Sequence, residues 1–464
     1  MSPVRTASEA VRTPPAAGPA AAPRRAPRPW GAEVRGGLAP WGAAAMFLNL
    51  LVPLAAKAAH WQGSWAQTEY ELHVLASLLG GSLAAATGCW QGGRERRRGT
   101  AELRASAPRG PLAQFLTASL PVAAGLAVGY LAVSATALLA SWPYVSSGGP
   151  RFSALAADAL YLVAMTLVGH TVGRLVSWRP TAPVLAVCAY AVLGVPSYQG
   201  GEVRYLDPAL QYGTGEELPV WWHPYAMVLW TCGLAVAVVL VYAAGGRRAR
   251  TVALLPLAAA CGAAVLIVHS GASMWREDPA ALRETCAGAA PRICVTAVNR
   301  DLLPQVTGAL AGISGRLKGV ENAPSRFVDS AGRVRPGDVE LPQFFLGQNV
   351  VRGRLTDPER FAWETGASLA PGSCGTGNRD GRFSRTSGAV QDWLISSGLS
   401  ERRRASDEEA ARRYGTAAQV ADDKKGRAAL DRLTAMGAEA RRAWLGRYFA
   451  ATRGTCDKDG VPAL

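Results

Sequence analysis

Residues 113–142 read AQFLTASLPVAAGLAVGYLAVSATALLASW, a stretch of thirty residues without a charged side chain. About 20 apolar helical residues cross the hydrocarbon core of a bilayer, so this stretch can span one. Six more apolar stretches accompany it within the first 270 residues. The seven cover residues 40–59, 73–90, 113–142, 153–172, 181–197, 223–244 and 251–269, and the fifth is short. The sequence therefore predicts an α-helical polytopic membrane protein with about seven transmembrane helices.

Positive charge falls on alternate connections between these stretches. Segments 1–39, 91–112, 173–180 and 245–250 together hold 17 arginine and lysine residues. The other connections hold Arg151 and Arg204, with Lys57 at the end of the first stretch. Because cationic loops tend to stay in the cytoplasm, this asymmetry predicts a multi-pass plasma-membrane protein with a cytoplasmic N-terminus and an extracytoplasmic C-terminal region. The tryptophans expected at the outer interface are Trp61, Trp65, Trp142, Trp221 and Trp222.

Composition over the whole chain hides a division into three parts. Residues 1–39 are rich in Ala, Pro and Arg and are expected to form a disordered cytoplasmic tail. This tail does not resemble a signal peptide, because its first apolar segment starts near residue 40. Residues 40–270 form the expected lipid-embedded domain, and 271–464 form an extracytoplasmic domain. The net charge of +15 is spread over all three parts, and the topology accounts for the cytoplasmic arginines, so we do not expect a nucleic-acid partner.

Cysteines give an independent indication of the side on which the last domain lies. Four of them, Cys286, Cys294, Cys374 and Cys456, fall within it. An even number in a soluble domain indicates disulfides formed in an oxidising compartment. Three pairings are possible; we favour Cys286 with Cys294, across a short intervening segment, and Cys374 with Cys456. No His follows His269 and no two-residue Cys spacing occurs, so no metal site is expected.

The outer domain is expected to be small, disulfide-bonded and of the α+β class. Apolar residues at alternating spacings of three and four predict a helix within 299–319 whose stripe packs in the core. Ser406 and Glu409 have capping-box spacing, and a longer helical run covers about 416–450. Short β-prone pieces lie within 326–334 and 339–351. The apolar stripe consists of Leu303, Val306, Leu310, Ile313 and Leu317.

Polar residues within the apolar stretches are candidates for function, because their burial in lipid is expensive. Asp158 lies about one turn inside the outer end of the fourth stretch, Asn49 near the middle of the first, and His170 near the inner end of the fourth. For Asp158 two interpretations remain open: a water-accessible structural position, or a role with substrate or protons. Gly125 and Gly129 form a small-x-x-x-small face suited to close helix packing, within one chain or between two.

The connection between the second and third stretches carries a motif. Residues 94–110 read RERRRGTAELRASAPRG. Taken alone, this is a positively charged inner loop. It resembles the corresponding loop of ABC-2 type transporter permeases, in which a charged run, Gly-Thr, a short helix and a Pro-containing turn recur. The residues that carry the resemblance, with the charged run they extend, are Glu95, Arg96, Arg97, Arg98, Gly99, Thr100, Glu102, Leu103, Ala107, Pro108 and Arg109.

The resemblance implies a permease-like subunit of an ABC exporter. In that family this loop docks on an ATP-binding subunit, so a separate cytoplasmic ATPase is the implied partner, with two identical or related permease chains forming the pathway. The sequence has no Gly-x-x-x-x-Gly-Lys-Ser/Thr motif with which to bind nucleotide itself. The family usually has six spans with both ends inside, whereas this chain adds a seventh and an outer domain. That domain, with Cys286, Cys294 and the following Leu303-Pro304, is similar to actinobacterial permease-like proteins of unassigned function.

Catalysis by the outer domain is not expected. The missing His removes Ser-His and Cys-His arrangements, no Gly-x-Ser-x-Gly occurs there, and nothing indicates a cofactor. A second class of function stays open beside the exporter subunit. The chain could be a non-transporting membrane anchor or sensor that presents an extracytoplasmic binding domain.

Overall fold

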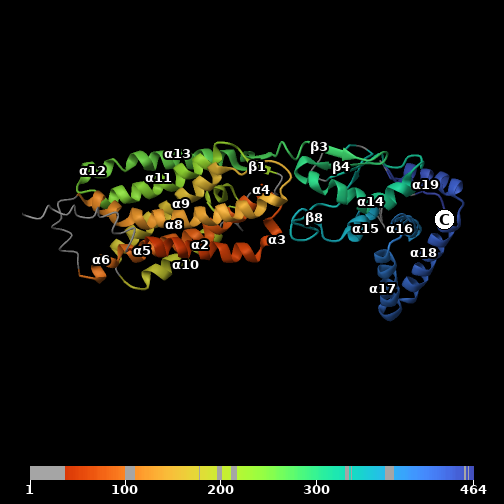
Figure 1. The fold of residues 1–464 in the computed structure, drawn as a ribbon, viewed down its shortest axis with the longest axis horizontal. Helices are drawn as coiled ribbons and strands as arrows, with labels where there is room; N and C mark the ends of the chain where they lie inside the picture. The colour runs from red at the N-terminus through yellow and green to blue at the C-terminus, as the bar shows by residue number, and fades with distance from the viewer. Residues whose placement is uncertain are drawn as a thin grey trace, which may run out of the picture.

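The computed structural model divides along its long axis into a helical bundle and a smaller mixed domain (Figure 1). The two are joined where strand β1 of the bundle half pairs with β2, the first strand after the last long apolar helix. The residues that the structure describes are 37–99, 110–176, 178–195, 201–210, 217–329, 334–335, 337–370, 381–453, 456–457 and 459–464.

Six described helices are long and apolar enough to cross a membrane. They confirm the helical, membrane-spanning character expected from the sequence. A seventh apolar helix, α10, has 14 residues and is shorter than the others. The helices of the bundle are α2 (Ala39–Ala56), α3 (Ala58–Trp61), α4 (Trp65–Leu75), α5 (Gly81–Gly92), α6 (Arg94–Arg97), α8 (Pro111–Ser141), α9 (Phe152–Leu175), α10 (Thr181–Gly194), α11 (His223–Ala243), α12 (Arg247–Thr251) and α13 (Leu254–Ser270).

The second span begins at Trp65, eight residues before the start predicted from hydropathy. Ser64 caps it, because its hydroxyl oxygen accepts a hydrogen bond from the Gln67 amide. The span continues from α4 through a π-helical turn, η1 (Ala76–Gly80), into α5. The earlier start brings Glu69 and Glu71 into the bundle, where both are buried.

Glycines allow the membrane helices to pack backbone against backbone. A Cβ at Gly88 or Gly92 of α5 would overlap carbonyl oxygens of α9, and one at Gly169 or Gly173 of α9 would overlap carbonyls of α5. Both helices thus use a Gly-x-x-x-Gly face for close approach. The glycines singled out in the sequence, Gly125 and Gly129, meet the Ala39 and Ala43 carbonyls of α2. Their packing therefore lies within the chain.

Arginine-rich connections gather at the end of the bundle away from the mixed domain. Helices α6 and α12, which carry three arginines each, lie at that end in Figure 1. Arg174 lies in the last turn of α9, which runs toward the same end. Below, this arginine-rich end is called the inner end and the end beside the mixed domain the outer end.

The mixed domain contains a four-stranded sheet in the order β3-β4-β5-β6. Strands β3 and β4 are antiparallel, whereas β4, β5 and β6 are parallel neighbours. Cys286 and Cys294 lie opposite each other across β3 and β4 and form the predicted disulfide. The strands of the chain are β1 (Glu217–Pro219), β2 (Trp275–Glu277), β3 (Glu284–Ala287), β4 (Arg292–Thr296), β5 (Arg326–Val328), β6 (Val339–Glu340), β7 (Val350–Val351) and β8 (Arg354–Leu355).

Helices cover this sheet and extend beyond it. The predicted apolar stripe is buried along α14, which confirms its place in the core.

Two predictions for the last helices differ from the structure. The predicted cap at Ser406 is wrong: α17 begins at Gly398, and Ser397 with Ser400 forms its capping box. The expected run over 416–450 is broken into two helices near Gly437. The helices are α14 (Leu303–Leu317), α15 (Pro358–Leu369), α16 (Gly381–Ile395), α17 (Gly398–Tyr414), α18 (Ala417–Ala435) and α19 (Ala438–Thr452), with shorter 3-10 turns η2 (Trp142–Tyr144), η4 (Glu202–Leu206), η5 (Gly271–Met274) and η6 (Ala297–Leu302).

The mixed domain docks directly on the outer end of the bundle. Arg352 Nε donates a hydrogen bond of 2.7 Å to Gln62 Oε1. Arg300 Nη2 donates one of 3.2 Å to the Ser146 carbonyl, and the Asp301 amide donates one of 3.4 Å to the Ser146 hydroxyl. These contacts join segments that are far apart in sequence, so the two halves meet through a defined surface.

Candidate intramembrane polar site

A carboxylate, an imidazole and a phenol meet inside the outer half of the bundle. Asp158 of α9 places Oδ1 2.7 Å from Nδ1 of His73 on α4. Its other oxygen, Oδ2, accepts a hydrogen bond of 2.8 Å from the hydroxyl of Tyr130 on α8. Asp158 is 6% exposed and Tyr130 is fully buried. Three helices thus contribute to one polar site, and the carboxylate has a partner on each oxygen.

The loop that follows α10 closes this site from a fourth direction. The Pro208 carbonyl accepts a hydrogen bond of 2.9 Å from the Ser77 hydroxyl and also hydrogen-bonds the His73 ring. The His73 ring therefore has oxygen atoms of Asp158 and Pro208 as its two partners.

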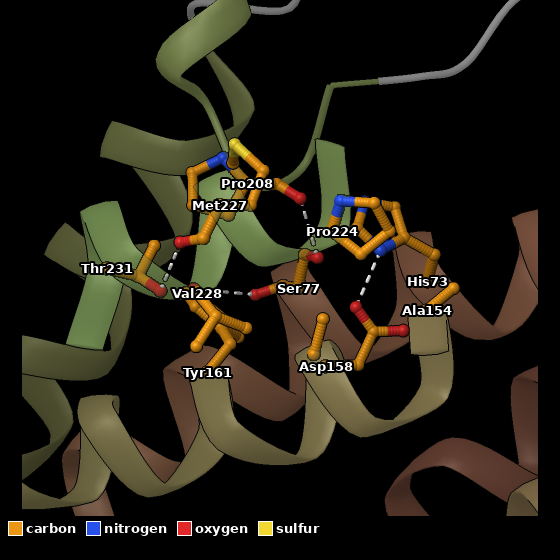
Figure 2. Close-up of a pocket in the computed structure, with 11 residues that line it drawn as sticks. His73, Ser77, Ala154, Asp158, Tyr161, Pro208, Pro224, Met227, Val228 and Thr231 are labelled. Carbon is orange, nitrogen blue, oxygen red and sulfur yellow. Dashed lines mark hydrogen bonds and ion pairs between the residues drawn. The ribbon is translucent and has the colours of Figure 1, made fainter. Parts of the chain in front are cut away.

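A small cavity lies beside the pair (Figure 2). Its volume is about 30 Å³, and His73, Ser77, Asp158 and Thr231 supply its polar walls. A cavity needs about 10–15 Å³ of such space to hold one water molecule. The cavity in this conformation therefore has room for water or a small ion beside the carboxylate, and not for an organic substrate.

Further polar pairs lie closer to the outer surface. Arg151 Nε is 2.6 Å from Glu69 Oε2, and the Arg151 amide also donates to this carboxylate. The Thr68 and Ser141 hydroxyls are 2.7 Å apart. Since Glu69 is 4% exposed, the arginine supplies the counter-charge that its burial requires. Together with His73 and Asp158, these pairs make the outer half of the bundle polar in its interior.

The other polar residues expected within the membrane do not join this site through any hydrogen bond or ion pair between described residues. The amide nitrogen of Asn49 is buried on α2 and has no hydrogen-bond partner among the described residues. His170 lies toward the inner end of α9, where Arg174 Nε donates to its Nε2 at 3.1 Å. Its ring packs edge-on against Phe115, with centroids 4.8 Å apart. Of the three residues selected from the sequence, Asp158 alone lies in the polar site.

The charged loop is described in part. Residues 94–97 form α6, and Gly99 follows with a φ of 66°, a conformation suited to glycine. Arg97 places its guanidinium carbon 4.3 Å from the centre of the Trp90 ring and donates to the Trp90 carbonyl. Arg96 donates a hydrogen bond of 3.5 Å to the Leu175 carbonyl of α9. The side chain of Glu95 and residues 100–109, with Thr100, Glu102, Leu103, Pro108 and Arg109, lie outside what the structure describes.

Cysteine positions agree with the expectation where the structure describes them. Cys456 is also disulfide-bonded, whereas its predicted partner, Cys374, lies outside the described residues. Glu284 lies beside the Cys286–Cys294 bridge, but both sulfurs are consumed by the bond, and Glu284 pairs with Arg326 at 2.9 Å. This group therefore offers no thiolate to a metal ion.

Sequence reasoning missed His73, Tyr130 and Glu69. The apolar stretch predicted from the sequence begins at His73 and leaves Glu69 outside it. One signal could have found Glu69 and His73: together with Ser77 they are spaced four residues apart, which puts them on one face of a helix. No protein-family model, curated protein or solved structure matches the chain.

Proposed function

We propose that this chain is the membrane-spanning, permease-like subunit of an ABC transporter, an exporter that works with a separate cytoplasmic ATPase. The observation that carries the proposal is the segment 94–99 at the inner end. Its sequence resembles the ATPase-coupling loop of ABC-2 type permeases, and Arg96 and Arg97 tie it to the ends of α9 and α5. A push on this segment by a partner would be transmitted to both helices.

The buried polar site supports a transport role. Ionisable groups within membrane helices are costly and commonly mark substrate, ion or proton pathways. Asp158 and His73 lie on helices α9 and α4, and α9 also packs through its glycine face against α5. A movement at the inner end of α5 and α9 would therefore reach the polar site along the same rigid helices. A second permease chain, identical or related, would complete the pathway.

Seven crossings form part of the proposal. Helix α9 ends at the inner end, whereas residues 202–208 lie at the outer end, because Pro208 meets Ser77 and Glu202 lies against Gly271. The chain between them has to travel the length of the bundle. The 14 residues of α10 rise about 21 Å at 1.5 Å per residue and so cover part of that length. This count leaves the N-terminus in the cytoplasm and the disulfide-bonded domain outside.

Co-purification tests the ATPase partnership. In detergent extracts of cells that express the chain with its genomic neighbours, we expect a stoichiometric ATP-binding protein to accompany it. Replacing residues 94–98 with alanine and serine should remove that protein. The matched control replaces Arg247, Arg248 and Arg250 of the other inner loop and should retain it. A chain that purifies alone, or that loses the partner equally with both variants, contradicts the proposal.

Sidedness has a separate test. A membrane-impermeant protease added to intact cells should cleave within 271–464, and inverted vesicles should protect this region. The opposite pattern would contradict an odd number of crossings. It would leave the ATPase test unaffected, because that test concerns the inner loop alone.

A non-transporting anchor or sensor is the second candidate. The direct docking of the mixed domain on the outer end of the bundle favours it, since a ligand outside could alter the bundle through Arg352 and Arg300. This candidate predicts that the chain purifies without an ATP-binding protein.

A further inference from the structure

A second, larger cavity lies at the seam between the bundle and the mixed domain. Its volume is about 340 Å³, which lies within the range of small-molecule binding pockets. Both halves of the chain line it: residues 60–71 from the bundle, and residues 298–299 and 343–350 from the mixed domain. The cavity is distinct from the small one beside His73, because α4 presents different faces to the two.

One charged group in this cavity is incompletely satisfied. Glu71 is 7% exposed, and its nearest counter-charge is Lys57 Nζ at 3.7 Å. It makes no hydrogen bond with any residue that the structure describes. A buried carboxylate normally accepts several hydrogen bonds, whereas Glu71 has the ion pair with Lys57 and, among the described residues, no hydrogen bond. The site therefore offers a negative charge to a donor that fills the cavity.

The rest of the lining suits an amphipathic molecule. Side-chain amides come from Gln67, Gln343 and Gln348, and these amides make no hydrogen bonds within the described part of the chain. Phe345 is 46% exposed and supplies an aromatic surface. A cation can pair with a carboxylate while its apolar part lies against an aromatic ring.

The position of the cavity points to the same kind of ligand. It lies beside the outer end of α4, where Trp65 packs edge-on against the largely exposed Trp142 with ring centroids 6.0 Å apart. Tryptophan pairs of this kind lie at the boundary between lipid and water. A molecule with one polar and one apolar end concentrates at that boundary.

We propose that the seam cavity binds a small amphipathic amine, whose ammonium group pairs with Glu71 and whose apolar part lies against Phe345. The amine could come from a free solute or from an amine-bearing lipid headgroup, since the recognised chemistry is the same. The assignment does not rest on the proposed ATPase partner. It would hold equally for an anchor or sensor.

Calorimetry on the full-length protein in lipid nanodiscs tests this assignment. Hexylammonium is the probe, hexanoate is its anionic counterpart, and empty nanodiscs give the background. We expect saturable binding of hexylammonium and none of hexanoate. Glu71→Gln should weaken hexylammonium binding at least tenfold, whereas Glu277→Gln, an exposed carboxylate of β2, should leave it unchanged.

Equal binding of the two probes, or equal affinity for hexylammonium in the wild type and Glu71→Gln, would overturn the assignment. Should Glu71→Gln fail to fold, Phe345→Ala is the second variant, and it should fold because that ring is already partly exposed. Unaltered affinity for hexylammonium in Phe345→Ala would also overturn the proposal. Repeating the titration in discs that contain an amine-headgroup lipid separates the two sources. Competition by the lipid identifies the headgroup as ligand, and undiminished binding identifies a solute.

Discussion

Arg352 of the mixed domain and Gln62 of the membrane half are 290 residues apart in sequence, yet Arg352 Nε donates a hydrogen bond of 2.7 Å to Gln62 Oε1. Gln62 is buried whereas Arg352 is exposed, so this contact is partly shielded from water. Hydrogen bonds to charged donors contribute about 1.5–3 kcal/mol, more than neutral ones. This pair therefore helps to hold the outer domain in one orientation on the bundle.

Substitutions of Gln62 should either weaken or strengthen the docking of the mixed domain on the bundle. Gln62→Ala removes the acceptor, and we expect faster amide hydrogen exchange over residues 343–356, by roughly tenfold for each 1.4 kcal/mol lost. Gln62→Glu supplies a charged acceptor and should slow exchange in the same peptides. Unchanged exchange in both variants would show that the contact does not stabilise the docked arrangement.

In the membrane half, we expect substitution of Asp158 to cause the largest loss of thermal stability. Asp158→Ala removes the partner of His73 and of the Tyr130 hydroxyl, and breaking a buried ion pair costs about 3–5 kcal/mol. Thermal unfolding in detergent should show a large loss for Asp158→Ala and a smaller one for Tyr130→Phe. A double-mutant cycle of Asp158→Asn with His73→Gln should give a coupling free energy above about 0.5 kcal/mol. Additive effects in that cycle would mean that the two side chains do not interact.

The close contacts between α5 and α9 predict that no larger side chain fits at their glycine positions. Gly92→Val or Gly173→Val would place methyl groups against the carbonyls of the facing helix. We expect a loss of about 1–3 kcal/mol or more in thermal stability, as for other overpacked sites. Gly262→Val on α13 is the matched control, because no atom lies within 4 Å of a Cβ there. Equal losses at all three positions would argue against specific packing.

Asp392 makes the outer domain sensitive to pH. Burial raises the pKa of its carboxyl, nearby Arg404 lowers it and Asp407 raises it further, with burial the largest effect. Because the fold favours the protonated carboxyl, the stabilisation from this group is present below its unfolded pKa of about 4 and is lost as pH rises through the folded pKa. We expect Asp392→Asn to slow hydrogen exchange in α16 at pH 7.5, with a smaller gain at pH 5. Asp423→Asn, an exposed carboxylate, should show no such pH dependence.

Periodicity and charge placement predict much of the membrane half, because long apolar helices and arginine-rich loops follow from the properties of lipid itself. They also predict α14, whose stripe from Leu303 to Leu317 is buried, and the Cys286–Cys294 bridge, which a short loop permits. The second span predicted from the sequence is too short at its start, because the charges of Glu69 and Glu71 lower the mean hydropathy of that segment. In the fold, these charges are offset by Arg151 and Lys57.

The polar site could not be assembled from sequence, because its members come from different helices. Asp158 and His73 are 85 residues apart, and Asp158 and Tyr130 are 28 residues apart. Their meeting depends on how α4, α8 and α9 pack, and a glycine face such as Gly125 with Gly129 can be found in the sequence without showing which helix it contacts. The Asp158 position was identified from its cost in lipid alone, without its partners.

The π-helical turn at Ala76–Gly80 explains how one span can serve both of these arrangements. A π turn takes in an extra residue, which rotates the chain before it by about 100° relative to an uninterrupted α-helix. The inner part of the span can then keep Gly88 and Gly92 against α9, while the outer part swings Glu69 and His73 toward Arg151 and Asp158. Deleting a single residue there would restore a regular α-helix. The span could then keep either its glycine contacts with α9 or its polar contacts with Arg151 and Asp158, but not both.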